Sequence, residues 1–419
     1  MRSLFLILVA CAGPALGAPA APPPPRGHLV IIGGHLEDNN AEVWRTIVAL
    51  AGGRGAHIAV LPSAAADPNA SGAAAAARLN QYGAHAFVVP VSVQLRGRAA
   101  AVATADDVQL AQRVARAGGA FFVGGDQSRI TAALRRPDGQ PTRVLDALWS
   151  LYRTGGVLAG TSAGAAIMSR TMYRDAESVL GTLSAPVRDG YEVTPGLGFI
   201  GDDVFIDQHM IARGRFARML PAMLAGRYTL GLGVDENTAL VVEPTRAVRV
   251  IGASGAIVLD LTGSRSQQDA GGLRAENVRI SYADAGDTLQ LPGGDLAPGQ
   301  GKRPVDAARP YFHGSLFTPD ILGRGTVVDL MTKLVDSDQQ RGRGLAFGDP
   351  AGAGGTPGFE FTFTRTPETR AWLSNVTERY SVYRLRMDVQ PVRMATPLYA
   401  PLEEHPAAPA VLAVPEPAR

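Results

Sequence analysis

The sequence predicts an α/β fold built on a doubly wound, mostly parallel sheet. Short apolar runs recur along the first part of the chain, and each is followed by a stretch with helical periodicity. The runs are continuously rich in Val, Ile and Leu, which is typical of parallel strands that are buried on both faces. Their alternation with helices favours one sheet covered by helices on both sides.

Five runs are expected to form the parallel strands: Leu29–Ile32, Ile58–Leu61, Ala86–Val89, Ala120–Val123 and Val157–Ala159. The helices expected between them are Ala41–Gly52, Ala73–Tyr82 and Asp106–Ala117, the last with Asp106 or Thr104 as its cap. Glycines directly follow two of the strands, at Gly124-Gly125 and at Gly160. Sheets of this type bind ligands at this carboxyl edge, so both positions are candidates for a site.

The pattern changes after residue 230, where short strands with close turns suggest a β-rich extension of the same domain. The expected strands lie within Leu230–Val242, Ala247–Ile251, Ala256–Leu261, Val278–Tyr282 and Thr288–Leu291. Residues 292–304 have the Pro/Gly composition of a linker. We therefore expect a larger domain at 28–291 and a smaller C-terminal domain at 305–405, with a helix at Ile321–Val335 and strands at Phe359–Phe363 and Tyr380–Val389. The Pro/Ala-rich tail at 406–419 is expected to be mobile.

The N-terminus has the features of a secretory signal. A positive charge at Arg2 precedes an apolar stretch that is too short to span a bilayer, and Ala15-Leu16-Gly17 is a plausible cleavage site. Residues 1–17 are therefore expected to be removed, leaving a Pro/Ala-rich tether at 18–27 and a secreted or periplasmic protein. Cys11 allows a lipid anchor as the lesser alternative, and no later segment has the sequence of a transmembrane helix.

Composition narrows the chemistry. The formal net charge is +2, so no strong field indicates a nucleic-acid or membrane partner. Cys11 is the single cysteine and falls in the predicted signal, so cysteine catalysis and disulfides are not expected in the mature protein. No histidine spacing of the H-E-x-x-H kind is present, and neither a metal nor another cofactor is expected.

The strongest chemical signal is Gly160-Thr161-Ser162-Ala163-Gly164. It follows an apolar strand and precedes a helix start, which is the context that a G-x-S-x-G nucleophile elbow requires. The turn would lift the Ser162 hydroxyl above the sheet edge and leave the Ala163 N–H beside the reacting oxygen. A plain Gly-rich turn with a capping serine is the structural alternative.

A serine nucleophile needs a base, and His209 is the histidine that follows the elbow at the end of another apolar run. The carboxylate that would orient it is expected at Glu177 or Asp175, which lie between Ser162 and His209. Asp207 is a weaker candidate because it is two residues from His209 along an extended strand. Shortly after His209 come three arginines, which form either a solvated basic face or a cluster for substrate carboxylates: Arg213, Arg215 and Arg218.

Six motifs, taken together and in order, resemble those of the cyanophycinases, serine peptidases of the peptidase E-like group, family S51. They are Ile31-Ile32-Gly33-Gly34 with Glu37-Asp38; Leu61-Pro62-Ser63-Ala64; Gly124-Gly125-Asp126-Gln127; Gly160-Thr161-Ser162-Ala163-Gly164-Ala165-Ala166; Asp207-Gln208-His209 with the three arginines; and Gly233-Val234-Asp235-Glu236-Asn237-Thr238. The joint pattern covers about residues 28–291 and is more specific than any single motif. The segment after residue 300 has no counterpart in the compact members of that group.

The resemblance implies a flavodoxin-like fold of the kind shared with class I glutamine amidotransferases, and a Ser–His–Glu triad with Ser162 and His209 in the first two roles. It implies an oxyanion hole from Gly125, Asp126 and Ala163. The side chains that it places against the substrate are Gln127, Asp207, Gln208, Arg213, Arg215 and Arg218. The implied substrate is cyanophycin, a poly-aspartate with arginine on its side-chain carboxyls, cleaved to β-Asp-Arg dipeptides, and a homodimer is one expected assembly.

Two other functions fit the same residues. One is an exopeptidase that removes Asp from short peptides with the same triad. The other is a secreted binding protein that kept the fold and lost catalysis. A class I amidotransferase is disfavoured, because its nucleophile is a cysteine and this elbow holds Ser162.

Overall fold

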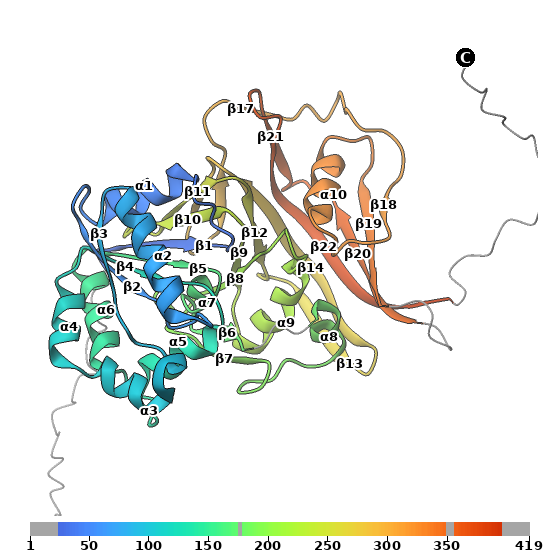
Figure 1. The fold of residues 1–419 in the computed structure, drawn as a ribbon. Helices are drawn as coiled ribbons and strands as arrows, with labels where there is room; N and C mark the ends of the chain where they lie inside the picture. Colours follow the sequence, from blue (N-terminus) through green and yellow to red (C-terminus); the bar gives the residue numbers. More distant parts are fainter. Residues whose placement is uncertain (1–23, 175–177, 349–355, 396–419) are drawn as a thin grey trace, which may run out of the picture.

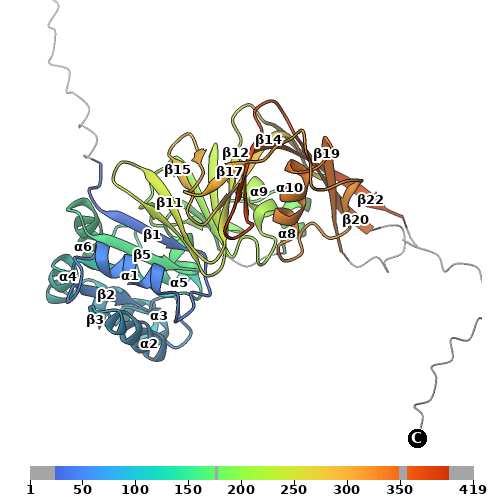
Figure 2. The same cartoon turned by 90° about the horizontal axis from the view of Figure 1, so that it is seen from above.

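The computed structural model describes residues 24–174, 178–348 and 356–395, which form two large sheets side by side (Figure 1, Figure 2). From edge to edge, the first sheet contains β16 (Asp295–Ala297), β15 (Thr288–Gln290), β11 (Ala247–Gly252), β10 (Thr238–Val242), β1 (His28–Ile32), β5 (Val157–Thr161), β4 (Gly119–Phe122), β2 (His57–Leu61) and β3 (His85–Val88). The strands from β1 to β3 in this order are parallel, and β10, β11, β15 and β16 are antiparallel. The predicted parallel α/β sheet is confirmed.

Helices cover both faces of this sheet, as predicted. Helices α1 (Ala41–Leu50) and α2 (Pro68–Gln81) lie on one face; α3 (Val93–Ala105), α4 (Val108–Ala115), α5 (Gln127–Leu134) and α6 (Arg143–Arg153) lie on the other. Alternate residues of β1 pack against the helices on opposite faces of the sheet, because neighbouring side chains of a strand point to opposite faces. Leu29 and Ile31 join the core under α3–α6, and Val30 and Ile32 join the core under α1 and α2.

Capping side chains fix two helix starts that periodicity alone placed differently. Helix α2 begins at Pro68, ahead of the predicted Ala73, because Asp67 accepts a hydrogen bond from the Ala70 N–H and proline suits the first helical turn. Helix α4 is capped by Asp107, whose carboxylate accepts from the Leu110 N–H at 2.7 Å. In both helices a short polar side chain, and not the apolar pattern, sets the boundary.

The second sheet combines the predicted β-rich extension with the C-terminal segment. Its main path is β18 (Leu316–Thr318), β19 (Arg341–Phe347), β20 (Thr356–Thr364), β22 (Tyr380–Met394), β14 (Gly272–Asp284), β12 (Gly255–Asp260), β9 (Leu230–Val234) and β8 (Val204–Gln208). Beside this path β13 (Arg265–Asp269) pairs with β14, and β21 (Arg370–Ser374) joins β22 to β17 (Lys302–Pro304). A separate small sheet holds β6 (Thr171–Tyr173) and β7 (Val193–Pro195).

The C-terminal segment therefore differs from the separate domain predicted at 305–405. Strand β22 pairs with β14 between Val382 and Val389, so the two segments belong to one sheet. They also share one core, in which α8 (Val179–Ser184), α9 (Phe216–Gly226) and α10 (Thr326–Val335) pack together with the strands. The linker predicted at 292–304 contains β16 and β17, which pair with β15 and β21.

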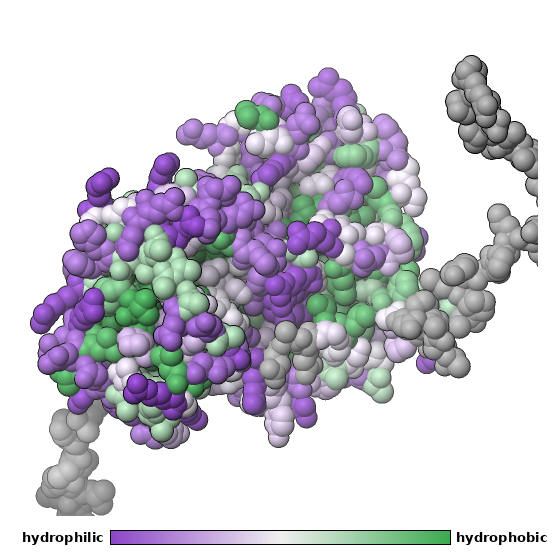
Figure 3. Space-filling view, viewed as in Figure 1, coloured by the Kyte–Doolittle hydropathy of each residue, from purple (hydrophilic) through white to green (hydrophobic). Residues whose placement is uncertain are grey.

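The face seen in Figure 3 is mainly hydrophilic, with smaller hydrophobic areas over both sheets. In the part of the chain that the structure describes, no helix has the length and hydropathy needed to cross a membrane.

Candidate active site

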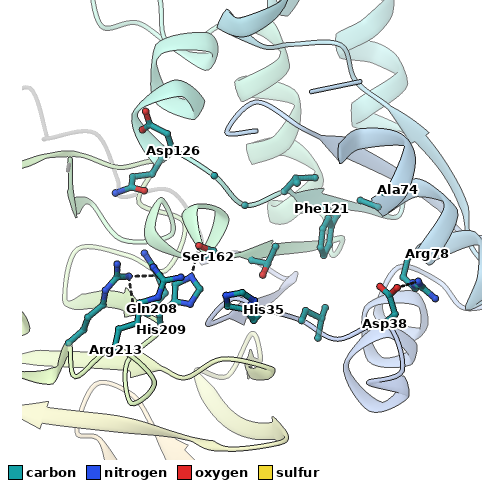
Figure 4. A pocket seen from close by; sticks show the side chains of 18 of the residues that line it. His35, Asp38, Ala74, Arg78, Phe121, Asp126, Ser162, Gln208, His209 and Arg213 are labelled. Atoms are coloured by element: carbon teal, nitrogen blue, oxygen red, sulfur yellow. Dashed lines mark hydrogen bonds and ion pairs between the residues drawn. The ribbon is translucent and has the colours of Figure 1, made fainter. Parts of the chain in front are cut away.

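A cleft of about 690 Å³ opens where β1, β4, β5 and β8 end (Figure 4). Because β8 belongs to the second sheet, both sheets contribute to this cleft. Its walls are formed by His35, Leu36, Asp38, Trp44, Ala74, Ala75, Arg78, Phe121, Val123, Gly124, Gly125, Asp126, Gln127, Thr161, Ser162, Arg174, Gln208, His209, Arg213, Arg215 and Arg218. Strand ends are where sheets of this type place ligands, so the cleft lies where the sequence predicted a site.

Ser162 has the backbone geometry of a nucleophile elbow. Its φ of 53° and ψ of −109° are unusual for a residue with a side chain. The flanking glycines are required by space: a Cβ on Gly160 would lie 2.2 Å from the Gly164 carbonyl oxygen, and one on Gly164 would lie 2.6 Å from the Phe122 carbonyl oxygen. The Ser162 N–H donates to the Ile32 carbonyl at 2.9 Å and fixes the turn to the end of β1.

His209 directly follows β8 and faces this serine. Its Nε2 lies 2.8 Å from the Ser162 Oγ, within hydrogen-bond distance. The His209 backbone also has a positive φ, of 52°, and its N–H donates to the Gly33 carbonyl at 2.8 Å. Gly34 leaves room for the imidazole, because a Cβ there would lie 2.2 Å from the His209 Cε1. The end of β1 and the loop that follows it thus contact both Ser162 and His209.

The carboxylate at the other imidazole nitrogen is Glu236, whose Oε1 lies 2.7 Å from the His209 Nδ1. The sequence analysis did not select this residue; its candidates Glu177 and Asp175 lie outside the described residues. The parallel register of β8 and β9 pairs Gln208 with Val234, so the residues after both strand ends meet. An acidic residue directly after an apolar strand is the sequence signal that could have indicated Glu236, whereas the register that brings it to His209 is known only from the structure.

The loop that carries Glu236 is anchored on both sides. The Asp235 carboxylate accepts hydrogen bonds from the Ile211 and Ala212 N–H groups, at 3.0 and 2.8 Å, just after His209. The Asn237 N–H donates to the Gly34 carbonyl at 2.8 Å. These bonds leave the Glu236 side chain directed at the imidazole with only 15% of its surface exposed.

Electrostatics favour a neutral imidazole beside an ionised carboxylate. Burial lowers the pKa of His209 to about 4; the charges of Arg213 and Arg215 act in the same direction, and Glu236 opposes them. Burial alone would raise the pKa of Glu236, but the His209 hydrogen bond and the nearby His35 and Arg213 bring it below its ordinary value. A neutral His209 can accept a proton from Ser162 through Nε2 while Nδ1–H donates to Glu236.

The three N–H groups that the sequence analysis expected in an oxyanion hole differ in their hydrogen bonding. Among the described residues, no acceptor pairs with the N–H of Ala163 or Gly125. The Asp126 N–H, also predicted for this role, instead donates to the Ala64 carbonyl at 3.0 Å, and its side chain caps α5 through the Ser128 N–H. Gly125 has a φ of +142°, and a Cβ there would lie 2.2 Å from the Ala64 carbonyl oxygen.

The predicted substrate residues divide into two groups. Gln127, Gln208, Arg213, Arg215 and Arg218 line the cleft, but Asp207 does not. Asp207 is 2% exposed and accepts two hydrogen bonds from Arg218, at 2.6 and 2.7 Å. Arg218 is equally buried and lies against the Tyr173 ring, so the guanidinium that reaches the cleft wall is already paired with Asp207.

The other polar groups of the wall are held in different ways. Gln127 donates to the Tyr173 carbonyl at 2.6 Å, and Arg215 donates to the Gln208 side chain at 2.8 Å. Burial lowers the pKa of Arg215 to about 10, which still leaves it charged at neutral pH. Arg213 is 46% exposed and lies 3.6 Å from Glu236, which makes it the most accessible of the three predicted arginines.

One group of three potential metal ligands is found within the described ranges. Ligand atoms of His35, His209 and Glu236 lie within 4.8 Å of one another. Two of these residues are hydrogen-bonded to each other, and His35 Nε2 lies 3.7 Å from the Glu236 Oε1. A neutral imidazole and a carboxylate adopt this arrangement without a metal.

Comparison with known proteins identifies the family of this chain. Residues 29–250 match the model of peptidase family S51, which is more than half of the chain. A cyanophycinase of Synechococcus elongatus is 33% identical over 238 residues, which are 56% of this chain and 68% of that protein. A cyanophycinase of Trichormus variabilis is 29% identical over 269 residues, covering 63% of this chain and 85% of that one.

Among solved structures, a peptidase from an acI-B1 actinobacterium superposes with a TM-score of 0.47 at 20% identity, covering 64% of this chain and 98% of that one. The family match spans the elbow, the histidine and the Glu236 loop that form the hydrogen-bonded row described above. The chain belongs to peptidase family S51 and is a serine peptidase.

Proposed function

We propose that this peptidase hydrolyses cyanophycin, a poly-aspartate that carries arginine on its side-chain carboxyls, and releases β-Asp-Arg dipeptides. The observation that carries the proposal is the row Ser162–His209–Glu236 at the base of a cleft with several arginines in its wall. Arginines suit a polymer rich in carboxylates, because a guanidinium can bind both oxygens of one. The cyanophycinase relatives support the same substrate.

In the proposed mechanism, His209 takes the Ser162 proton as Oγ attacks the carbonyl carbon of the scissile amide. Glu236 keeps the imidazole in the required tautomer and stabilises the imidazolium that forms. The Gly125 and Ala163 N–H groups donate to the tetrahedral oxyanion, each contributing about 3 kcal/mol of barrier lowering. The imidazolium then protonates the leaving amine, and water releases the acyl group by the reverse sequence of proton transfers.

The test is incubation of the purified protein with insoluble cyanophycin, with clearing followed by turbidity and products identified by mass. Release of Asp-Arg dipeptides by the parent and not by Ser162→Ala is the expected result. Cleavage of short Asp-peptides without clearing would replace the polymer with the exopeptidase substrate. No hydrolysis of either would contradict both and favour a binding protein.

The third residue of the proposed triad has its own test. Glu236→Gln should lower kcat by about 10²- to 10⁴-fold, because the amide cannot stabilise the imidazolium and permits the wrong tautomer. Glu177→Gln is the matched control, since it makes the same change at the position predicted from sequence. A large loss in Glu177→Gln with normal activity in Glu236→Gln would overturn this assignment.

We also propose, from the N-terminal signal pattern at 1–17, that the enzyme acts outside the cytoplasm. Expression in a secreting host and mass analysis of the product should give a mature N-terminus directly after Gly17. A lipid-modified Cys11 at the N-terminus, or an intact Met1, would contradict this cleavage.

A further inference from the structure

The cleft continues past Ser162, away from the arginine cluster, to an end that the mechanism does not use. Figure 4 shows Ser162 near the middle, with Gln208 and Arg213 on one side and Phe121, Asp38 and Arg78 on the other. Only Asp38 is anionic among the lining residues at this second end. The two ends of one cleft therefore offer different chemistry.

Asp38 is an accessible carboxylate. Its side chain is 73% exposed, and among the described residues its ion-pair partner is Arg78 of α2, which is 25% exposed. A carboxylate has two oxygens and about four acceptor sites, so one arginine partner leaves capacity for a second cation. At the arginine end, by contrast, the carboxylates of Asp207 and Glu236 are largely buried.

The backbone that carries Asp38 is fixed in place. The Asp38 carbonyl accepts a hydrogen bond from the Tyr82 hydroxyl at 2.9 Å, and the neighbouring Glu37 carbonyl accepts from the Trp44 indole at 3.0 Å. The Glu37 N–H donates to the Asn237 side chain at 3.1 Å, next to Glu236. Asp38 therefore keeps a defined position relative to the reacting residues without any help from substrate.

An apolar wall lies between Ser162 and Asp38. Figure 4 shows Phe121 in this position. The apolar residues that line the cleft are Leu36, Trp44, Ala74, Ala75, Phe121 and Val123. The rings of Trp44 and Phe121 lie 5.5 Å apart and are almost fully buried, so this wall is packed and rigid. An apolar surface that ends at a carboxylate suits an arginine side chain, whose three methylenes can lie on the wall while the guanidinium reaches the charge.

We infer that Asp38, at the end of this wall, is a guanidinium subsite that binds an arginine side chain of the substrate during cleavage. The inference rests on the proposed function for its substrate and goes beyond it, because it assigns the selection of positive charge to a residue outside the Ser162–His209–Glu236 row and the arginine cluster. The cleft would then bind substrate carboxylates at one end and a substrate guanidinium at the other, which suits a side chain that carries both.

The experiment measures binding to Ser162→Ala protein, in which the substrate stays intact. The probes are a short β-Asp-Arg oligomer and the same oligomer with citrulline, whose neutral urea has the shape of the guanidinium. Calorimetry should show about fivefold tighter binding of the arginine oligomer, the ratio expected for one exposed ion pair. Asp38→Asn, added to Ser162→Ala, should abolish this preference.

Glu37→Gln is the matched control. It removes the same charge from the neighbouring residue, and the Glu37 side chain does not line the cleft. It should keep the preference for arginine, and thermal unfolding of all variants should show equal folding. Equal binding of the two oligomers by the Ser162→Ala protein, or an unchanged preference after Asp38→Asn, would overturn the subsite. A loss in Glu37→Gln as large as in Asp38→Asn would also overturn it, since general charge would then explain the effect.

The outcome is separable from that of the proposed function. Failure of the parent to clear cyanophycin would reject the polymer substrate, whereas the subsite is decided by charge-selective binding without turnover. Turnover of cyanophycin by Asp38→Asn with a KM equal to that of the parent would keep the function and reject the subsite.

Discussion

Two residues with side chains, Ser162 and His209, adopt left-handed backbone conformations at the reacting centre. Each such position costs of order 1–3 kcal/mol and persists only when its surroundings hold it. Here the end of β1 does so, because the Ile32 and Gly33 carbonyls accept the N–H groups of the two residues. The relative position of Ser162 and His209, the proposed nucleophile and base, is therefore set by one strand end before substrate binds.

Gly34 tests this arrangement. Gly34→Ala adds a Cβ that would lie 2.2 Å from the His209 ring, so the imidazole must leave the position in which it contacts Ser162. A displacement of about 1 Å at a catalytic group can cost about 100-fold in rate, and kcat should fall by at least that much. Gly53→Ala is the control, since Gly53 also has a positive φ but no neighbour within 4 Å. Normal kcat in Gly34→Ala would show that the ring has more freedom than the packing indicates.

The pH dependence of kcat/KM reports the base of the free enzyme. Proton acceptance requires neutral His209, and burial lowers its pKa to about 4 from an ordinary 6.5. With a soluble β-Asp-Arg oligomer, kcat/KM should stay constant from neutral pH down to about pH 5 and fall as the pH approaches 4. An acid limb at pH 6.5 or above would contradict this environment for His209.

Arg213 gives that prediction a direction. Its positive charge contributes to the lowered pKa of His209, so Arg213→Gln should move the acid limb of kcat/KM to higher pH. Arg309→Gln removes an exposed positive charge that does not line the cleft, and it should leave the acid limb in place. A limb that does not move in Arg213→Gln would show that burial alone sets the His209 pKa.

At the residue scale, the sequence predicted the site residues that are specified by their immediate neighbours in the chain. Ser162 could be found because five adjacent residues specify the elbow, and His209 because it follows an apolar run. Glu236 is 27 residues from His209, and its approach depends on the register of β8 with β9. The Asp126 N–H was similarly assigned without knowledge of the Ala64 carbonyl, which a distant strand end brings to it.

At the element scale, the strands of the first sheet were predictable because burial on both faces makes them continuously apolar. Strands β16 and β17 were not, because most of their side chains are exposed and their sequence is rich in proline and glycine. What makes them strands is pairing with β15 and β21, which local composition does not record.

Lys302 in β17 connects the segment predicted as a linker, residues 292–304, to the second sheet. It is one of the two lysines of the chain, with a side chain 4% exposed, and its Nζ contacts Asp287 at 2.6 Å and Asp284 at 3.1 Å. Nζ also donates to Ser381 of β22 at 2.8 Å. Burial raises the pKa of Asp284, and Lys302 opposes that shift. The ammonium group of Lys302 therefore compensates the negative charge of the buried Asp284 and Asp287 carboxylates.

Lys302→Met should therefore lower the free energy of unfolding by about 3–5 kcal/mol, the cost of leaving buried charge uncompensated. The other lysine is the control: Lys333 forms an exposed pair with Asp329 within α10, and Lys333→Met should cost no more than about 0.5 kcal/mol. Denaturant unfolding followed by circular dichroism measures both. Equal, small losses of unfolding free energy in the two variants would show that the Lys302 cluster is hydrated and does not stabilise the fold.

At the scale of the whole molecule, the C-terminal segment contacts the residues around Glu236. Arg324, just before α10, lies 3.4 Å from the Glu236 Oε2, and the Gly325 N–H donates to the Ile211 carbonyl. The family match ends at residue 250, so these contacts come from a part of the chain beyond it. Composition suggested a boundary near residue 300, but the pairing of β14 with β22 crosses it.

Phe361 tests whether the molecule unfolds as one unit. It is fully buried in β20, and its ring lies 5.5 Å from that of Phe216 in α9, so the contact joins the two segments that the sequence predicted to be separate. Phe361→Ala should lower the free energy of unfolding by about 3–5 kcal/mol through the cavity it leaves. Because the core is shared, the protein should still unfold in one transition, and peptidase activity should disappear at the same, lower temperature.

Phe317→Ala, at a phenylalanine of β18 that is 55% exposed, should change stability by less than about 0.5 kcal/mol. Calorimetry of Phe361→Ala that shows two transitions, with activity following the unshifted one, would instead make the C-terminal segment an independent domain.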